Sequence, residues 1–173
     1  MWLFETMNRR SIGLMGLASM VAATLSACGF RLRQPYDYAF KTIAVLPSPG
    51  AGVALELRRS FGQGVQALAS GSDPSKAEVV LQVLEERRVK VVVGTTAAGQ
   101  VREFQLRIHL KFQLRTAQGK DLIPVTEISQ QRDSSFTESA VLAKDAEEAM
   151  LYRDMQTDLV QQLLRRLAAV KSL

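Results

Sequence analysis

The segment 101–115 alternates polar and apolar residues from Glu103 to its end, and this alternation constrains the fold more than any other feature of the sequence. Alternation with a period of two predicts a β-strand with one face packed against a core and the other face in water. The apolar members are Phe104, Leu106, Ile108, Leu110, Phe112 and Leu114. The chain must therefore cover one face of the sheet that contains this strand with a second layer.

Three further segments have strand character. Residues 41–46 form a short apolar run that predicts a buried strand. Residues 78–93 are rich in valine, but the charged run at 85–88 leaves two interpretations open, a β-bulge or charges on a solvent-facing ladder. The pattern at 122–136 is weaker, and Pro124 favours an edge strand or the beginning of a strand.

Two segments have helical periodicity. Residues 53–68 place apolar side chains on one helical face, although Gly62 and Gly64 each weaken a helix by about 1 kcal/mol relative to alanine. Near the end of the chain, Asp145 has a glutamate three residues later, which predicts the N-terminus of a second helix. The apolar residues of that helix are Leu151, Met155, Leu159, Leu163, Leu167 and Val170.

The order of the predicted elements is strand, helix, three strands and helix. A strand, helix and strand in succession normally form a parallel pair with a right-handed crossover, whereas the hairpins that follow are antiparallel. We therefore expect an α+β two-layer sandwich in which both helices pack on a mixed four-stranded sheet (β-α-β-β-β-α). Residues 41–173 suit one such domain and not two.

The first 27 residues have the order of an export signal. Arg9 and Arg10 precede the apolar run 12–25, which ends in small residues. A membrane-spanning helix is the alternative, but glycine and serine interrupt the run, which is shorter than the roughly 20 apolar residues that a span requires. The sequence therefore predicts that residues 1–27 are a signal peptide.

Cys28 is the only cysteine of the chain, so it has no internal partner for a disulfide. Together with the three residues before it, it reads Leu-Ser-Ala-Cys, which resembles the bacterial lipobox. That resemblance implies that the sulfur of Cys28 is acylated and that the signal is cut off just before this residue, and several acyl chains hold a protein stably on a membrane. Gly29, rather than aspartate, implies the outer membrane. Residues 28–40 are then a lipidated N-terminal tether.

No catalytic constellation is evident in the sequence. The only histidine, His109, lies between Arg107 and Lys111 on the polar face of the long strand, and a triad or zinc site needs more histidines or cysteines. We therefore expect no enzyme activity, no metal and no cofactor. The net charge of +5 is compatible with an anionic partner, although charges on the wet face of a strand are ordinary. Nucleic acid is not an expected partner of an exported lipoprotein.

Three blocks of the sequence resemble the LptE family of lipopolysaccharide-assembly lipoproteins. They are CGFRLR at 28–33, GQVREFQ at 99–105, and LAKD at 142–145 followed by the helix that ends with LLRRL at 163–167. The resemblance implies a non-enzymatic protein that is anchored in the outer membrane by its lipid. It also implies a complex with an LptD-like β-barrel, in whose lumen the protein sits as a plug, and a role in delivering lipopolysaccharide to the cell surface.

The resemblance also implies candidate residues for lipopolysaccharide binding. The phosphates of lipid A call for lysine or arginine, and Lys144 matches the basic residue of the family's Ala-Lys-Asp block. The family's other basic position corresponds to Ala97 and Ala98 in this chain, which leaves two alternatives: the nearby Arg102 substitutes, or the direct contact is absent. Without the resemblance, Lys144 would be interpreted as an ordinary solvated lysine.

Two other functions remain open on the sequence alone. The chain could be a general outer-membrane lipoprotein that binds peptidoglycan or another envelope protein as an adaptor. A lipid-anchored hydrolase is the third hypothesis, which the lack of a catalytic constellation disfavours. Co-purification with a large β-barrel distinguishes the first function from the other two.

Overall fold

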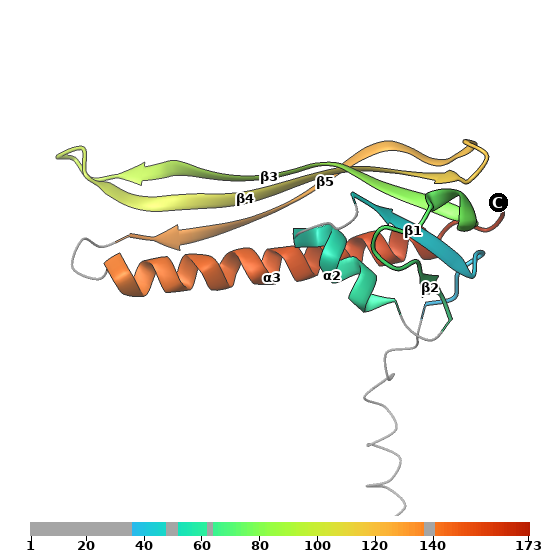
Figure 1. The fold of residues 1–173 in the computed structure, drawn as a ribbon. Helices are drawn as coiled ribbons and strands as arrows, with labels where there is room; N and C mark the ends of the chain where they lie inside the picture. The colour runs from blue at the N-terminus through green and yellow to red at the C-terminus, as the bar shows by residue number, and fades with distance from the viewer. Residues whose placement is uncertain (1–35, 48–51, 62–63, 137–140) are drawn as a thin grey trace, which may run out of the picture. The chain divides into compact units, whose positions relative to one another are not determined.

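The computed structural model describes residues 36–47, 52–61, 64–136 and 141–173 (Figure 1). Cys28 and the predicted signal peptide lie outside these residues. The elements are β1 (Thr42–Leu46), α2 (Gly52–Ser60), β2 (Gln66–Ala67), a 3-10 helix (Pro74–Lys76), β3 (Val79–Thr95), β4 (Val101–Thr116), β5 (Asp121–Ser135) and α3 (Val141–Ala168).

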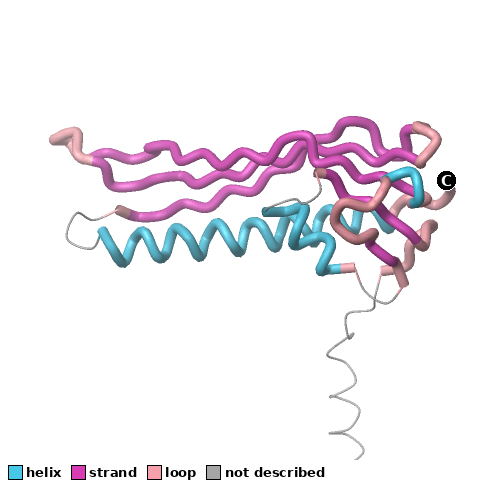
Figure 2. Tube along the Cα trace, viewed as in Figure 1, coloured by secondary structure: helices cyan, strands magenta, loops and turns pink. Residues whose placement is uncertain are grey.

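The strands form one mixed sheet in the order β2-β1-β3-β4-β5. Strand β1 is parallel to both of its neighbours, whereas β3, β4 and β5 form an antiparallel meander. The α+β fold is confirmed, with five strands rather than the predicted four. The additional strand is β2, which is short and lies at the edge beside β1 (Figure 2).

The predicted helix at 53–68 was too long, because α2 ends at Ser60 and the end of that segment pairs with β1. Gln66 donates its backbone N–H to the carbonyl oxygen of Lys41 at 2.8 Å, and Leu68 donates to that of Ile43 at 2.9 Å. Glycine has low helix propensity, so these inter-strand hydrogen bonds prevail where Gly64 would have weakened the helix.

Both helices cover the same face of the sheet, and α3 runs along the meander (Figure 1). The even-numbered residues of β4 point at the helices as predicted. Leu106, Ile108, Leu110, Phe112 and Leu114 have no exposed surface, and Phe104 is partly buried. The residues of α3 that complete this core are Met155, Leu159, Leu163 and Leu167, all with no exposed surface. Full burial of such a side chain stabilises the fold by roughly 1.5–3 kcal/mol.

Strand β3 changes the face that it presents to the helices at a β-bulge. The pairing with β4 shifts between Val83 and Glu85, so that Leu84 is the extra residue. Before the bulge, odd-numbered residues such as Leu81 lie beside the buried residues of β4, and after it even-numbered residues such as Glu86 do so. A bulge was one of the two interpretations that the sequence left open. It lies just before the charged run.

Glu86 holds the beginning of α2 against the sheet. One of its carboxylate oxygens accepts a hydrogen bond from the backbone N–H of Val53 at 2.9 Å, where the helix has unpaired donors and a positive end. Gly52 precedes this contact with φ +53°, and a Cβ there would lie 2.3 Å from the same carboxylate. Glu85 and Glu86 are successive residues of the strand and point to opposite faces, and Glu86, on the helix-covered side, is partly buried.

The sheet and α3 have two ends, which are named here by their loops. The proximal end contains the beginning of β1, the β4–β5 turn at 117–120 and the end of α3. Its strands are tied together by Glu78, whose carbonyl oxygen accepts from the N–H of Ala117 and whose carboxylate accepts from that of Lys41. The distal end contains the β3–β4 hairpin at 96–100, the end of β5 and the beginning of α3 (Figure 1).

Candidate functional site

The tip of the β3–β4 hairpin carries no charge. Thr96 donates its N–H to the carbonyl oxygen of Gln100 at 2.8 Å, and Gly99 closes the turn with φ +79°, a conformation that favours glycine. Ala97 and Ala98 lie exposed between them. The place where the resemblance implies a basic residue is therefore an uncharged exposed turn.

Arg102 lies at the distal end on β4, one residue beyond the start of the strand. Its carbonyl oxygen accepts a hydrogen bond from the N–H of Phe136 at 2.8 Å, which joins β4 to the end of β5. Its side chain is exposed and, within the described part of the chain, has no ion-pair partner. The guanidinium is therefore available to an anion from solution.

Lys144 lies inside α3, which corrects the prediction that Asp145 caps this helix. The helix begins at Val141, so Asp145 is in its second turn. The residues between them, Leu-Ala-Lys, are good helix formers and extend the helix by a turn. Asp145 and Glu148, which suggested a helix N-terminus, still lie near the positive end of the helix, but the helix begins before them.

The ammonium of Lys144 already has two partners. It donates to a carboxylate oxygen of Glu147 at 2.7 Å and to the hydroxyl of Ser135 at 3.1 Å. Since Ser135 pairs with Glu103, the neighbour of Arg102, both candidate residues lie at the same end of the meander. An anion that binds Lys144 must compete with Glu147.

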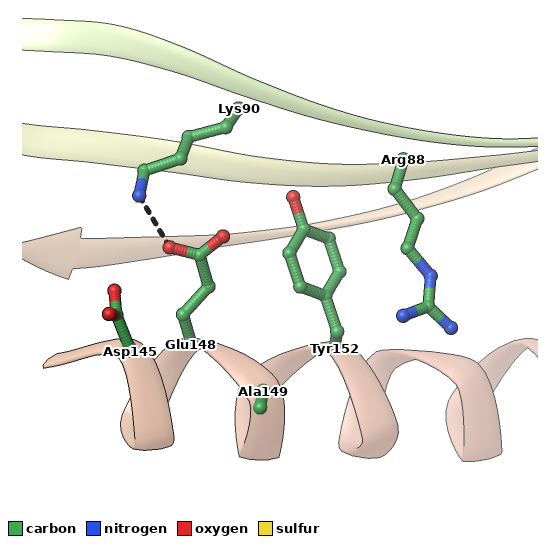
Figure 3. A pocket seen from close by; sticks show the side chains of 6 residues that line it. All are labelled: Arg88, Lys90, Asp145, Glu148, Ala149 and Tyr152. Carbon is green, nitrogen blue, oxygen red and sulfur yellow. Dashed lines mark hydrogen bonds and ion pairs between the residues drawn. The ribbon is translucent and has the colours of Figure 1, made fainter. Parts of the chain in front are cut away.

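A groove between β3 and the first half of α3 lies at this end of the domain (Figure 3). It is open to solvent and has a volume of about 360 Å³. Lys90 forms an ion pair with Glu148, and its Nζ lies 4.3 Å from the centre of the Phe104 ring. The lining residues are Arg88, Lys90, Asp145, Glu148, Ala149 and Tyr152.

Tyr152 forms the inner wall of this groove. Its hydroxyl donates to the backbone carbonyl of Val89 at 3.1 Å, and its ring lies 5.3 Å from the guanidinium carbon of Arg88. Burial raises the pKa of the Tyr152 hydroxyl, and the negative charge of Glu148 raises it further, whereas Arg88 acts in the opposite direction. The phenol therefore stays neutral and fixes the helix to the sheet.

Sequence reasoning missed this groove. Arg88 is the last residue of the charged run 85–88, which the sequence left open as a bulge or as solvent-facing charges, and Lys90 follows two residues later. Both lie on the helix-covered side of β3. Arg88 donates to the amide oxygen of Gln156 at 2.8 Å. Alternate residues of a strand lie on one face, and this spacing places Arg88, Lys90 and Val92 together. Only the bulge at Leu84 decides that this face is the one covered by the helices.

The outer face of the sheet is polar and its charges are mostly paired with one another. The Nε of Arg107 donates to the amide oxygen of Gln105 at 2.7 Å. The Nζ of Lys111 lies 3.6 Å from a carboxylate oxygen of Glu85, and the Nε of Arg115 lies 2.6 Å from one of Asp121. The basic side chains of β4 therefore belong to local pairs rather than to an unpartnered basic strip. The expectation of one packed and one wet face is confirmed.

His109 takes part in the same outer network. Its Nδ1 lies 2.9 Å from a carboxylate oxygen of Glu127 on β5. The hydrogen bond from His109 lowers the pKa of the Glu127 carboxyl, and the positive charges of Lys111 and Arg87 add to this effect. The contact is an exposed cross-strand pair.

Within the described residues, no group of histidine, cysteine, aspartate and glutamate is placed to hold a metal ion. No helix in this part of the chain is both long and apolar enough to cross a membrane. The candidate site is therefore a set of charged and aromatic side chains at the distal end.

Known proteins are similar to this chain in sequence and in fold. The sequence model of the LptE family, described as lipopolysaccharide-assembly, matches residues 40–167. A solution structure of lipoprotein B from Nitrosomonas europaea is 32% identical, covers 82% of this chain and 91% of its own, and has a TM-score of 0.69. Among curated protein sequences no significant match is found.

Two crystal structures with lower identity share the fold. A minor lipoprotein from Acinetobacter baumannii is 24% identical with a TM-score of 0.61, and covers 77% of this chain and 94% of its own. The rare lipoprotein B from Shewanella oneidensis is 18% identical with a TM-score of 0.62, and the match covers 75% of this chain and 95% of the Shewanella chain.

The fold and these neighbours define the class as a bacterial lipoprotein domain of two helices on a mixed sheet. Since the family match spans most of the chain, the particular family follows as well. The chain belongs to the LptE family and is a lipopolysaccharide-assembly lipoprotein.

Proposed function

We propose that this chain is anchored in the outer membrane by acyl groups on Cys28 and fills the lumen of an LptD-like β-barrel. In that place it assists the assembly of the barrel and the insertion of lipopolysaccharide into the outer membrane. The match of residues 40–167 to the LptE family is the observation that carries this proposal. It assigns no catalytic residue to the chain.

The surface of the domain suits a polar lumen. The interiors of large outer-membrane barrels are polar, and their apolar band faces lipid. The outer face of the sheet presents the odd-numbered residues of β4. Lys111 and Arg115 among them form ion pairs with Glu85 on β3 and Asp121 on β5. Placing paired charges against polar groups and water costs little free energy, whereas each unpaired charge would require a partner in the barrel wall.

The tether sets the orientation of the plug. We propose that residues 1–27 are removed as a signal peptide, that 28–40 form the lipidated tether and that 41–173 form the plug. Tyr36 and Tyr38 pack against the core, and Phe40 is buried in it, so the last part of the tether is fixed to the domain. The proximal end then lies at the periplasmic mouth and the distal end points into the lumen. Attachment by the lipid raises the effective concentration of the plug beside the barrel.

We further propose that Lys144 and Arg102 bind phosphate groups of lipopolysaccharide at the distal end. The guanidinium of Arg102 is available, and the ammonium of Lys144 is held between Ser135 and Glu147. Charge-assisted hydrogen bonds to phosphate are stronger than neutral ones, so a phosphate can compete for Lys144. Ala97 and Ala98 contribute no charge there, which makes Arg102 the second cation.

Affinity purification of the tagged, acylated chain from native envelopes tests the proposal. We expect a large β-barrel in one-to-one ratio and, by mass spectrometry, acyl groups on the amino-terminal Cys28. A Cys28→Ser variant is the matched control for the anchor. Recovery of cell-wall fragments or another envelope protein in place of a barrel would support the adaptor function and contradict the plug.

A further inference from the structure

The two ends of α3 differ in charge. Its acidic residues lie between Asp145 and Asp158, and no aspartate or glutamate follows in the sequence up to position 173. The basic residues Arg165, Arg166 and Lys171 lie in that last stretch, and all three are exposed. The domain therefore presents a net positive charge where α3 ends.

The β4–β5 turn adds another cation to this end. Lys120 and Asp121 line a groove with Arg166 and Lys171, with a volume of about 440 Å³ and an apolar floor that includes Val170. The only acid in the lining is Asp121, and Arg115 binds it at 2.6 Å. In the described part of the chain, the side chains of Lys120, Arg166 and Lys171 have no ion-pair partner.

Helix stability explains only part of this cluster. Cations in the last turn of a helix interact favourably with its negative end, which accounts for Arg165 and Arg166. Lys120 belongs to a turn of the sheet, and Lys171 lies beyond the last residue of α3. Neither is needed for the helix, yet both line the same groove as Arg166.

The chain enters the domain at this same proximal end. Lys41 donates its N–H to the carboxylate of Glu78, and the carbonyl oxygen of Glu78 accepts from Ala117 in the β4–β5 turn. Only seven residues, and so eight Cα–Cα steps, separate Cys28 from Tyr36, where the described domain begins. A fully extended chain of that length spans at most about 29 Å. Acyl groups on Cys28 would therefore keep the proximal end within this distance of the membrane surface.

We infer that, before the acylated chain enters a barrel, the proximal basic groove, lined by Lys120, Arg166 and Lys171, rests on anionic phospholipid headgroups of the leaflet that holds the acyl chains. The inference rests on the proposed acylation of Cys28. Electrostatic attraction to a membrane falls off within about 8 Å in physiological salt, and the tether is long enough to allow contact. Each lysine or arginine at an anionic surface favours contact roughly fivefold.

The distal end offers the exposed guanidinium of Arg102, but its lysines are paired. The ammonium groups of Lys90 and Lys144 are each bound to a glutamate of α3. Asp145 and Asp154 add further negative charge to the same half of the helix. In the chain that has not yet entered a barrel, contact through the proximal end therefore orients the domain with its long axis away from the membrane and its distal end farthest from the headgroups.

Quenching by spin-labelled headgroups tests this contact in the acylated full chain. A fluorophore is placed on Gln118→Cys in the β4–β5 turn, or on Ala98→Cys in the distal hairpin; both positions are exposed. The protein is anchored in vesicles of phosphatidylcholine alone or with phosphatidylglycerol. We expect quenching at position 118 to increase with phosphatidylglycerol and to decrease with salt, and quenching at position 98 to remain low in both vesicles.

Two charge variants decide whether the groove is responsible. Replacing Lys120, Arg166 and Lys171 together by glutamine lowers the ratio of docked to undocked protein by about 100-fold, since each residue contributes roughly fivefold. A matched variant with three glutamines at exposed or partly exposed cations elsewhere, Arg87, Lys111 and Arg153, has the same net charge and should keep the quenching. Thermal melting checks that both variants fold.

The inference is overturned if quenching at position 118 is the same in both vesicles, or if the two triple variants lower it equally. It is also overturned if the first variant loses the barrel in purification but keeps headgroup contact, because the partner of the groove is then protein. Mass spectrometry of Cys28 separates this result from failure of the anchor. If the chain is not acylated, flotation with anionic vesicles tests the groove alone, and failure to float contradicts the inference.

Discussion

Glu147→Gln and Lys144→Gln should change the affinity for lipopolysaccharide in opposite directions. Lys144 donates to Glu147 at 2.7 Å in the free protein, so a phosphate must displace this carboxylate before it can bind the ammonium. Removing the carboxylate frees the lysine, whereas removing the lysine leaves the phosphate with Arg102 alone. The structure therefore predicts a gain from one substitution and a loss from the other.

The magnitudes follow from the exposure of the pair. The side chains of Lys144 and Glu147 are 21% and 39% exposed, and an ion pair of this kind contributes about 0.2–1 kcal/mol. Glu147→Gln should therefore tighten binding by up to about fivefold. A charge-assisted hydrogen bond is worth about 1.5–3 kcal/mol, so after the ion pair is subtracted Lys144→Gln should weaken binding by roughly 1 kcal/mol, again about fivefold.

Direct binding of purified acylated protein to lipopolysaccharide at fixed salt measures both effects. Each variant loses the same ion pair, so their thermal stabilities should fall by similar small amounts, which makes each a stability control for the other. Barrel co-purification should be unchanged. If both substitutions shift the affinity in the same direction, Lys144 acts by holding α3 against β5 and the phosphate assignment is wrong.

Three further substitutions test the fold. Ile108→Ala empties a site with no exposed surface and should lower the free energy of unfolding by about 2–5 kcal/mol in denaturant titrations; an unchanged midpoint would contradict the assigned face of β4. Gly52→Ala places a Cβ 2.3 Å from the carboxylate of Glu86 at a backbone φ of +53° and should lower the free energy of unfolding by about 2–4 kcal/mol. The loss should be smaller when Glu86→Ala is also present. Equal losses in both backgrounds would argue against the clash. His109→Ala should return the lowered pKa of Glu127 towards its ordinary value of 4.5, and NMR of the Glu127 carboxyl group measures this change. Because that pKa is lowered on folding, the pair stabilises the protein above pH 4.5, and this contribution is lost as the pH falls through the lowered value.

Local rules placed some boundaries wrongly where tertiary contacts compete with them. Helical periodicity continues past Ser60, but Gln66 finds backbone partners on β1 that no local pattern reveals. Asp145 has the signature of a helix cap, yet the residues before it favour the helix enough to extend it to Val141. The Lys144 and Arg102 candidates came from resemblance alone, and the structure shows only that they lie at the same end of the meander.

The sequence by itself determined the layers of this protein. Strict alternation along β4 and the apolar stripe of α3 each allow only one buried face, because side-chain direction follows the period of the backbone. The tertiary structure alone decided which side chains β3 offers to the helices. One extra residue at Leu84 reverses its alternation, so Glu86 reaches the start of α2 and Lys90 reaches Glu148 on α3. A bulge is a feature of strand pairing, which involves residues far apart in the chain, and a single strand's pattern does not contain it.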